Sequence, residues 1–245
     1  MKKKYKTFAA IAFTMFTLCG CTKTNKTIIR MQKLEEGIEK SPTTEAELKE
    51  AIAKYENRIA DMQLASSQVG VWYKMLAVRY LDSKMYGEAL KYFQKAIQIY
   101  PENQNLFYYV GLCAGYMAKA SLDYGATGVS STTEKYNYLK LAESAYLRAV
   151  EIEPKYGRAL YGLGILYIFE LGQSEKAIPH LEKLLSFDTR NFDAMFILAR
   201  AYYENAEFDK AASLYDKIAS QTKSEQKKQE ALSNKKIVLD ASYSK

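Results

Sequence analysis

The sequence predicts an all-α protein, a superhelix of stacked helix–turn–helix units. Only 12 Gly and 4 Pro occur among the 245 residues, fewer turn residues than β-sandwiches or barrels use. Hydrophobic residues make up 48% of the chain, which is enough for a sizeable buried core. An alanine–aromatic–alanine pattern with helical spacing also recurs along the chain. It occurs at Ala89, Phe93 and Ala96 and again at Ala142, Tyr146 and Ala149.

The N-terminal segment is typical of a secretory signal. Its only charged residues are Lys2, Lys3, Lys4 and Lys6, and they account for four of the seven excess positive charges. The remaining balance is too small to indicate a nucleic-acid partner, so we expect none. An uncharged run of 12 residues follows at 7–18, shorter than the roughly 20 residues that span a bilayer as a helix. We therefore expect residues 1–20 to be a cleaved signal peptide.

Small residues precede a cysteine at the end of this segment. The stretch Leu18-Cys19-Gly20-Cys21 resembles the lipobox of bacterial lipoproteins, in which the sulfur of the last cysteine is diacylated. The resemblance implies lipidation of Cys21, a lipidated tether at 21–43, and a domain at 44–245 held in the periplasm on an envelope membrane. Thr22 somewhat favours the outer membrane. If Cys21 is lipidated and Cys19 is removed with the signal, Cys113 has no disulfide partner in the mature chain. The alternative to lipidation is an ordinary cleaved signal in which the cysteine occurs by chance.

Two helices are expected before the first repeat. Ile28, Met31, Leu34 and Ile38 have the spacing of a short amphipathic helix within the tether. Thr44 and Glu47 fit a capping box that opens a second helix. We expect this second helix to end near Ser66 and to cap the repeat that follows.

Four helix pairs then resemble tetratricopeptide repeats. This family has a large residue, a Leu-Gly or Leu-Ala pair and a Tyr on the first helix of each roughly 34-residue unit. Its second helix carries Ala, Phe or Tyr, a second Ala and a terminal Pro. The first helices match at Tyr73, Leu76, Ala77 and Tyr80; Phe107, Val110, Gly111 and Ala114; Leu160, Leu163, Gly164 and Tyr167; and Met195, Leu198, Ala199 and Tyr202. The second helices match at Ala89, Phe93 and Ala96; Ala142, Tyr146 and Ala149; Ala177, Leu181 and Leu184; and Ala211, Tyr215 and Ile218.

Spacing between equivalent positions predicts repeats at about 70–103, 104–156, 157–191 and 192–225. Ala89 and Ala142 lie 53 residues apart, which indicates a 19-residue insertion in the second repeat. Its first helix should run to about 122, followed by a Gly-, Ser- and Thr-rich loop and a helix resuming near 133. One further extra residue falls near Leu171-Gly172. A closing helix is expected at about 223–241.

The resemblance implies a right-handed superhelix with a concave groove that binds protein segments. Small residues such as Gly111 and Gly164 should let paired helices approach closely. The family's carboxylate clamp is not carried over, because only Lys74 of its basic and Asn-rich residues is present. The groove residues predicted from the first helices and the rim are Lys74, Val78, Tyr108, Leu112, Arg158, Tyr161, Ile165, Phe196 and Arg200.

No catalytic motif is recognisable in the sequence. Its single histidine, His180, lacks cysteines or paired carboxylates nearby, so we expect a surface or half-buried residue and neither metal nor cofactor. Glu143, Glu151 and Glu153 are expected on solvated helix faces. No Gly-rich phosphate loop or nucleophile elbow occurs, and we expect no enzyme activity.

Two functional hypotheses follow from these observations. The first is a membrane-anchored, non-catalytic scaffold that binds proteins of the bacterial cell envelope through a largely apolar groove. The alternative is a periplasmic accessory lipoprotein that handles solutes or lipids for a transport system.

Overall fold

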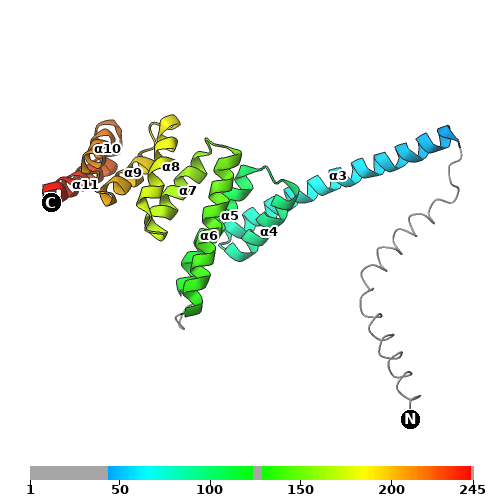
Figure 1. Ribbon diagram of the computed structural model, residues 1–245, viewed down its shortest axis with the longest axis horizontal. Coiled ribbons are helices and arrows are strands. Elements are labelled where there is room, and N and C mark those ends of the chain that lie inside the picture. Colours follow the sequence, from blue (N-terminus) through cyan, green and yellow to red (C-terminus); the bar gives the residue numbers. More distant parts are fainter. Residues whose placement is uncertain (1–43, 124–128, 244–245) are drawn as a thin grey trace, which may run out of the picture. The chain divides into compact units, whose positions relative to one another are not determined.

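The computed structural model describes residues 44–123 and 129–243, and these residues form helices and short turns with no strand (Figure 1). The all-α prediction is therefore confirmed. The signal peptide, Cys21 and the helix predicted within the tether lie outside the described residues. The helices are α3 (Glu45–Asp82), α4 (Tyr86–Ile99), α5 (Gln104–Asp123), α6 (Val129–Ile152), α7 (Gly157–Ile165), the π-helical η1 (Leu166–Glu170), α8 (Ser174–Phe187), α9 (Phe192–Glu204), α10 (Phe208–Gln221) and α11 (Glu225–Tyr243).

The chain divides into two compact units, residues 1–62 and 63–245. The described part of the first unit consists of Thr44 and the N-terminal part of α3. Its start is fixed by the predicted capping box, which is confirmed. The Glu47 amide donates to Thr44 Oγ1 at 3.3 Å, and the Thr44 amide donates to Glu47 Oε2 at 3.1 Å.

Helix α3 does not end near Ser66, so the predicted break between a capping helix and the first repeat is wrong. Gly70 does not interrupt the helix, because one glycine costs only about 1 kcal/mol relative to alanine. It is buried against α4, and a Cβ there would lie 2.6 Å from the Tyr100 ring. Tyr100 Oη also donates to the Ser67 carbonyl at 2.7 Å, which ties the end of α4 to this part of α3.

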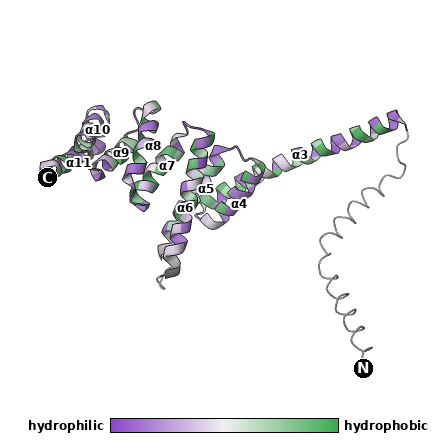
Figure 2. Ribbon diagram, in the orientation of Figure 1, coloured by the Kyte–Doolittle hydropathy of each residue, from purple (hydrophilic) through white to green (hydrophobic). Residues whose placement is uncertain are grey.

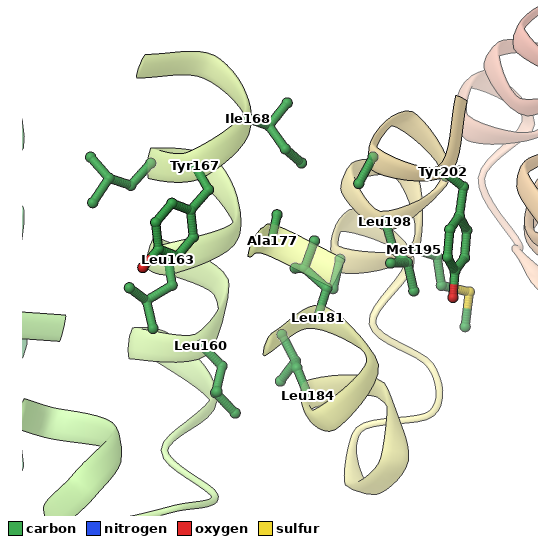
Figure 3. Packing of buried hydrophobic residues seen from close by; sticks show 14 of the residues in the cluster. Leu160, Leu163, Tyr167, Ile168, Ala177, Leu181, Leu184, Met195, Leu198 and Tyr202 are labelled. Carbon is green, nitrogen blue, oxygen red and sulfur yellow. The ribbon is translucent and has the colours of Figure 1, made fainter. Parts of the chain in front are cut away.

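From α4 to α11 each helix packs against the next one along the chain (Figure 1). Hydrophobic and hydrophilic residues alternate around these helices, so each has one apolar face to bury (Figure 2). The first alanine of each second helix is fully buried, at Ala89, Ala142, Ala177 and Ala211. Leucines of α7, α8 and α9 meet between these helices, as Figure 3 shows for Leu160, Leu163, Leu181, Leu184 and Leu198.

The expected close approach of paired helices is confirmed at two glycines. A Cβ added to Gly111 would lie 2.6 Å from the Tyr146 ring, and one added to Gly164 would lie 2.6 Å from Leu181 Cδ2. A Cβ added to Gly162 would lie 2.9 Å from Tyr146 Cζ, an approach that the repeat pattern did not predict. Real Cβ atoms do not come this near, so glycine is required at these contacts.

The insertion lengthens both helices of the second repeat, and α5 and α6 lie side by side (Figure 1). Helix α5 ends at Asp123, close to the expected position. Helix α6 begins at Val129, four residues before the expected start. Serine and threonine are only moderately poor helix formers, so the Ser/Thr run at 130–133 joins the helix.

The extra residue near Leu171-Gly172 is confirmed as a widened helical turn, η1. In the first and fourth repeats, Met85 donates to the Tyr80 carbonyl and Glu207 to the Tyr202 carbonyl, five residues back, each at 2.8 Å. In the third repeat the equivalent bond runs from Gln173 to the Tyr167 carbonyl, six residues back, also at 2.8 Å. A π-helical turn is the ordinary way for a helix to absorb one inserted residue.

Helix α11 closes the solenoid against α10. Ala231 and Val238 are buried, as expected of the apolar face of a closing helix. Leu232, which the pattern also placed on that face, is 43% exposed.

Candidate binding groove

A cavity of about 230 Å³ lies between α5, α6, α7 and η1, and we call it the middle cavity. Two of the predicted groove residues, Leu112 and Ile165, line it. Its only charged lining residues are Lys119 and Glu170, and Glu170 also pairs with Lys135 of α6 at 3.3 Å. The other lining residues are Gly115, Tyr116, Ala142, Tyr146, Gly162 and Leu166. The middle cavity is therefore apolar, with one charge of each sign among its walls.

Tyr146 contributes a wall of this cavity from the second helix of its repeat. Its ring is held between Gly111 and Gly162, which leave room for it because they lack a Cβ. Burial raises the pKa of the Tyr146 phenol well above its ordinary value. The side chain therefore stays neutral and offers an aromatic surface with a hydroxyl group.

Tyr108, another predicted groove residue, belongs to a cluster of tyrosines. Its ring centroid lies 6.0 Å from that of Tyr146 and 5.9 Å from that of Tyr156, the latter edge-on. Tyr156 Oη in turn donates to Asn105 Oδ1 at 2.7 Å. Burial raises the pKa of Tyr108, and the nearby charge of Arg158 partly opposes this rise. Tyr108 is thus packed into the wall between repeats rather than projecting freely.

A second cavity of about 400 Å³ lies among η1, α9, α10 and α11, and we call it the C-terminal cavity. Phe196 and Arg200 of the predicted groove line it. Arg200 is already engaged, because its Nε donates to Glu204 at 2.9 Å and its guanidinium lies 4.7 Å from the Phe169 ring centroid. Its other lining residues are Ile197, Tyr203, Tyr215, Glu230, Asn234, Ile237 and Val238.

The remaining predicted groove residues line neither cavity. Tyr161 is half-buried, and burial raises its pKa, with a further rise from the Asp193 carboxylate. Arg158 is exposed, while Lys74 and Val78 are half-buried on α3. The structure therefore brings Leu112 together with Ile165, and Phe196 together with Arg200, in two separate places.

Several cavity residues lie outside the predicted groove positions, because those positions belong to the first helices and the rim only. Tyr146 and Tyr215 stand at equivalent aromatic positions of second helices, and each lines one of the cavities. Tyr146 could have been predicted from Gly111 and Gly162. Each of these glycines leaves space for its ring on a neighbouring helix.

The groups that could carry chemistry have structural partners. His180 is half-buried and stacks on Tyr167 at 5.8 Å, and burial lowers its pKa. Burial raises the pKa of the Cys113 thiol to about 12, so this cysteine is unreactive at neutral pH. Among residues 44–123 and 129–243, no group of three His, Cys, Asp or Glu side chains could hold a metal ion. No helix in that part of the chain is both long and apolar enough to cross a membrane.

Glu143 departs from the expected solvated position. Its side chain is only 14% exposed, and it accepts hydrogen bonds from Tyr167 Oη at 2.9 Å and Lys140 Nζ at 2.8 Å. The bond from Tyr167 links α6 to η1, whereas the one from Lys140 lies within α6. The prediction was wrong because the partner comes from the next repeat, which the local helical spacing does not show.

Comparison with protein families and curated proteins agrees with the repeat pattern. Models described as tetratricopeptide repeat match residues 71–103, 145–178 and 169–232. A TPR repeat-containing protein of Borreliella burgdorferi is 24% identical over 221 residues, which are 89% of this chain and 93% of that protein. BBSome complex member BBS4 of Bos taurus is 33% identical over 81 residues, which are 33% of this chain and 15% of its own.

Solved structures show the same fold. YrrB, described as a TPR protein with an unusual peptide-binding site, superposes with a TM-score of 0.54 at 18% identity, covering 69% of this chain and 75% of its own. MamA superposes with a TM-score of 0.51 at 18% identity, covering 80% of this chain and 98% of its own. Residues 71–103 and 145–232 therefore contain tetratricopeptide repeats, and the chain has the fold of a tetratricopeptide-repeat solenoid.

Proposed function

We propose that this chain is a membrane-anchored, non-catalytic scaffold of the bacterial cell envelope that holds a segment of a partner protein in its groove. The middle cavity is the observation that carries this proposal. Apolar walls with a few polar groups are typical of sites that bury an anchoring side chain of a partner. Here Lys119 and Glu170 supply the charged groups that can orient the partner's backbone or flanking side chains.

The size of the middle cavity favours a protein segment over a free small molecule. Its volume of about 230 Å³ is below the range of roughly 300–1,000 Å³ typical of small-molecule sites. A single large apolar side chain fits such a space while the rest of the segment lies along the helices. The fold is shared with YrrB, whose structure is described as having a peptide-binding site, and this analogy supports the same mode of use.

Photocrosslinking in the producing cells tests the groove. A photoreactive residue at Leu112 should crosslink reproducibly to one envelope protein, and the same residue at Leu147 should not. Leu147 is 39% exposed on α6 and lines neither cavity, so it is a matched control. Ile165→Glu should abolish the crosslink from position 112 while the circular dichroism of the variant stays helical.

The outcomes separate the two functional hypotheses. An equal crosslink from positions 112 and 147 contradicts the groove, because it shows contact without site preference. A small molecule or lipid that co-purifies with the wild type but not with Ile165→Glu, without any protein crosslink, supports solute or lipid handling instead.

The anchor is the second part of the proposal, and it rests on the lipobox-like sequence. Cells fed radiolabelled palmitate should label the wild type and leave Cys21→Ser unlabelled. The wild type should sediment with membranes, and Cys21→Ser should appear in the soluble fraction. A palmitate label that persists in Cys21→Ser contradicts acylation at this residue.

A further inference from the structure

Five apolar side chains form a continuous stripe on the N-terminal part of α3. The α3 stripe consists of Leu48, Ile52, Tyr55, Ile59 and Met62. Their separations alternate between four and three residues, which places them on one helix face in the a and d pattern of a coiled coil. Their exposed fractions run from 43% for Tyr55 to 66% for Met62.

The rest of this helix surface is polar. Glu50, Lys54, Asn57 and Asp61 fall on the side opposite the stripe, and all four are exposed. Within residues 44–123 and 129–243, no segment covers this apolar face over its four turns, and an exposed apolar face of this length is typical of an interaction surface. The helix itself is well formed, since its capping box is complete and Lys49 pairs with Glu45 at 2.6 Å.

We propose that the α3 stripe is a homodimer interface, in which α3 of a second copy of this chain packs antiparallel against it. The heptad positions of the stripe fit a two-stranded antiparallel coiled coil. Ile52 and Ile59 occupy the a positions and Leu48 occupies a d position, and in an antiparallel pair each a residue packs against a d residue of the other helix. This interface is independent of the groove, because it lies in the first unit of the chain.

Charge complementarity sets the orientation. Lys49 and Glu56 both flank the stripe on the same edge, at e positions. In an antiparallel pair the e positions of the two helices face one another, so Lys49 of each copy meets Glu56 of the other. In a parallel pair, position 51 faces position 56 and position 58 faces position 63, which brings Ala51 to Glu56 and Arg58 to Gln63 and forms no ion pair.

The antiparallel register also matches the apolar side chains. With the two ion pairs in place, Leu48 lies opposite Ile59 of the second copy and Ile52 lies opposite Tyr55. Four apolar layers are formed over 12 residues, which are about 18 Å long as a helix. An interface this short is expected to give a dimer that dissociates on dilution.

Sedimentation of the purified full chain in one detergent, over a range of protein concentrations, tests the interface. The wild type should form a concentration-dependent dimer. Ile52→Glu/Ile59→Glu should raise the dissociation constant by roughly tenfold or more, because the two changes in each copy place one charge in each of the four apolar layers. Leu64→Glu is the matched control, since Leu64 is 71% exposed on the same helix but off the stripe, and it should dimerise like the wild type.

A charge exchange tests the orientation. Lys49→Glu and Glu56→Lys should each weaken the dimer, and the double variant Lys49→Glu/Glu56→Lys should regain wild-type affinity, which only the antiparallel pairing explains. If the dissociation constant is the same for the wild type and for both single variants, the antiparallel arrangement is overturned. A chain that stays monomeric at every concentration, or an Ile52→Glu/Ile59→Glu variant that dimerises like the wild type, overturns the interface itself, because another segment or protein then covers the stripe.

Discussion

At the scale of the residue, two glycines four positions apart on α5 have opposite roles. Gly111 faces the Tyr146 ring so closely that an added Cβ would lie 2.6 Å from it, whereas a Cβ at Gly115 would meet nothing within 4 Å. Gly111→Ala should lower the free energy of unfolding by about 1–3 kcal/mol, as overpacking does. Gly115→Ala should raise it by up to about 1 kcal/mol through helix propensity. Thermal unfolding of both variants checks this, and a loss of stability in Gly115→Ala contradicts it.

Glu143 gives a pH-dependent prediction. Burial alone raises the pKa of this carboxyl, but hydrogen bonds from Lys140 and Tyr167 outweigh burial and hold the pKa below its ordinary 4.5. The ionised form therefore stabilises the fold fully above pH 4.5, and this stabilisation is lost as the pH falls through the lowered pKa. Glu143→Gln should be less stable than the wild type at pH 7, and the gap should close below pH 4.5. Thermal unfolding against pH measures the gap, and a gap that is constant with pH contradicts the assignment.

Residues whose role depends on their own helix pair were predictable, and residues whose role depends on the next repeat were not. Gly111 packs on Tyr146 within one repeat, so the repeat pattern predicted it. Gly162 packs on the same ring from the following repeat, and Glu143 is held by Tyr167 from that repeat too. Contacts between repeats vary with side-chain size on both partners, which a pattern of single positions does not encode.

At the scale of the element, the turns that join paired helices share one conformation. Lys84, Gly172 and Ala206 all have left-handed backbones, with φ of 60°, 62° and 59°. These residues stand at the same point of the first, third and fourth repeats, directly before the amide that closes the turn. Glycine occupies this conformation without steric cost, and alanine or lysine does not.

This shared turn predicts opposite effects of opposite substitutions. Gly172→Ala should destabilise the protein by about 1 kcal/mol, although a Cβ there meets nothing within 4 Å. Ala206→Gly should stabilise it by a similar amount, because the left-handed strain is removed. Chemical denaturation of the two single variants provides the measurement. If both changes destabilise, backbone conformation does not decide stability at these turns.

The elements show where reading a sequence succeeds and where it fails. The one-residue excess near Gly172 was predictable, because the repeats on either side keep their register. The π-helical form of this insertion was not predictable, because one extra residue in a loop would give the same spacing between the repeats. The continuity of α3 through Ser66 was missed for a related reason. The repeat positions show where the first repeat begins. They do not show whether the helix before it ends there or continues into it, and the only sign of continuity is that no strong helix breaker follows Ser66.

At the scale of the whole molecule, stability should be local along the second unit, residues 63–245. Its buried residues form two clusters, one around Phe93 and Leu106 and a larger one from Ala114 to Val238. Each helix packs mainly on its chain neighbours, so the free energy of opening is set by nearby interfaces. The middle cavity is formed by helices that have further helices before and after them in the chain. The C-terminal cavity is lined in part by α11, the last helix.

Hydrogen exchange on matched core variants tests this local stability. Val238→Ala removes two methyl groups from a side chain that is 2% exposed, and it should speed exchange in α10 and α11 while α4 exchanges as in the wild type. Phe93→Leu, at a fully buried site in α4, should do the reverse. Uniform acceleration along the chain in either variant would show a single cooperative unit instead. Local opening has a consequence for binding, because Val238→Ala should then open the C-terminal cavity and leave a partner held in the middle cavity undisturbed.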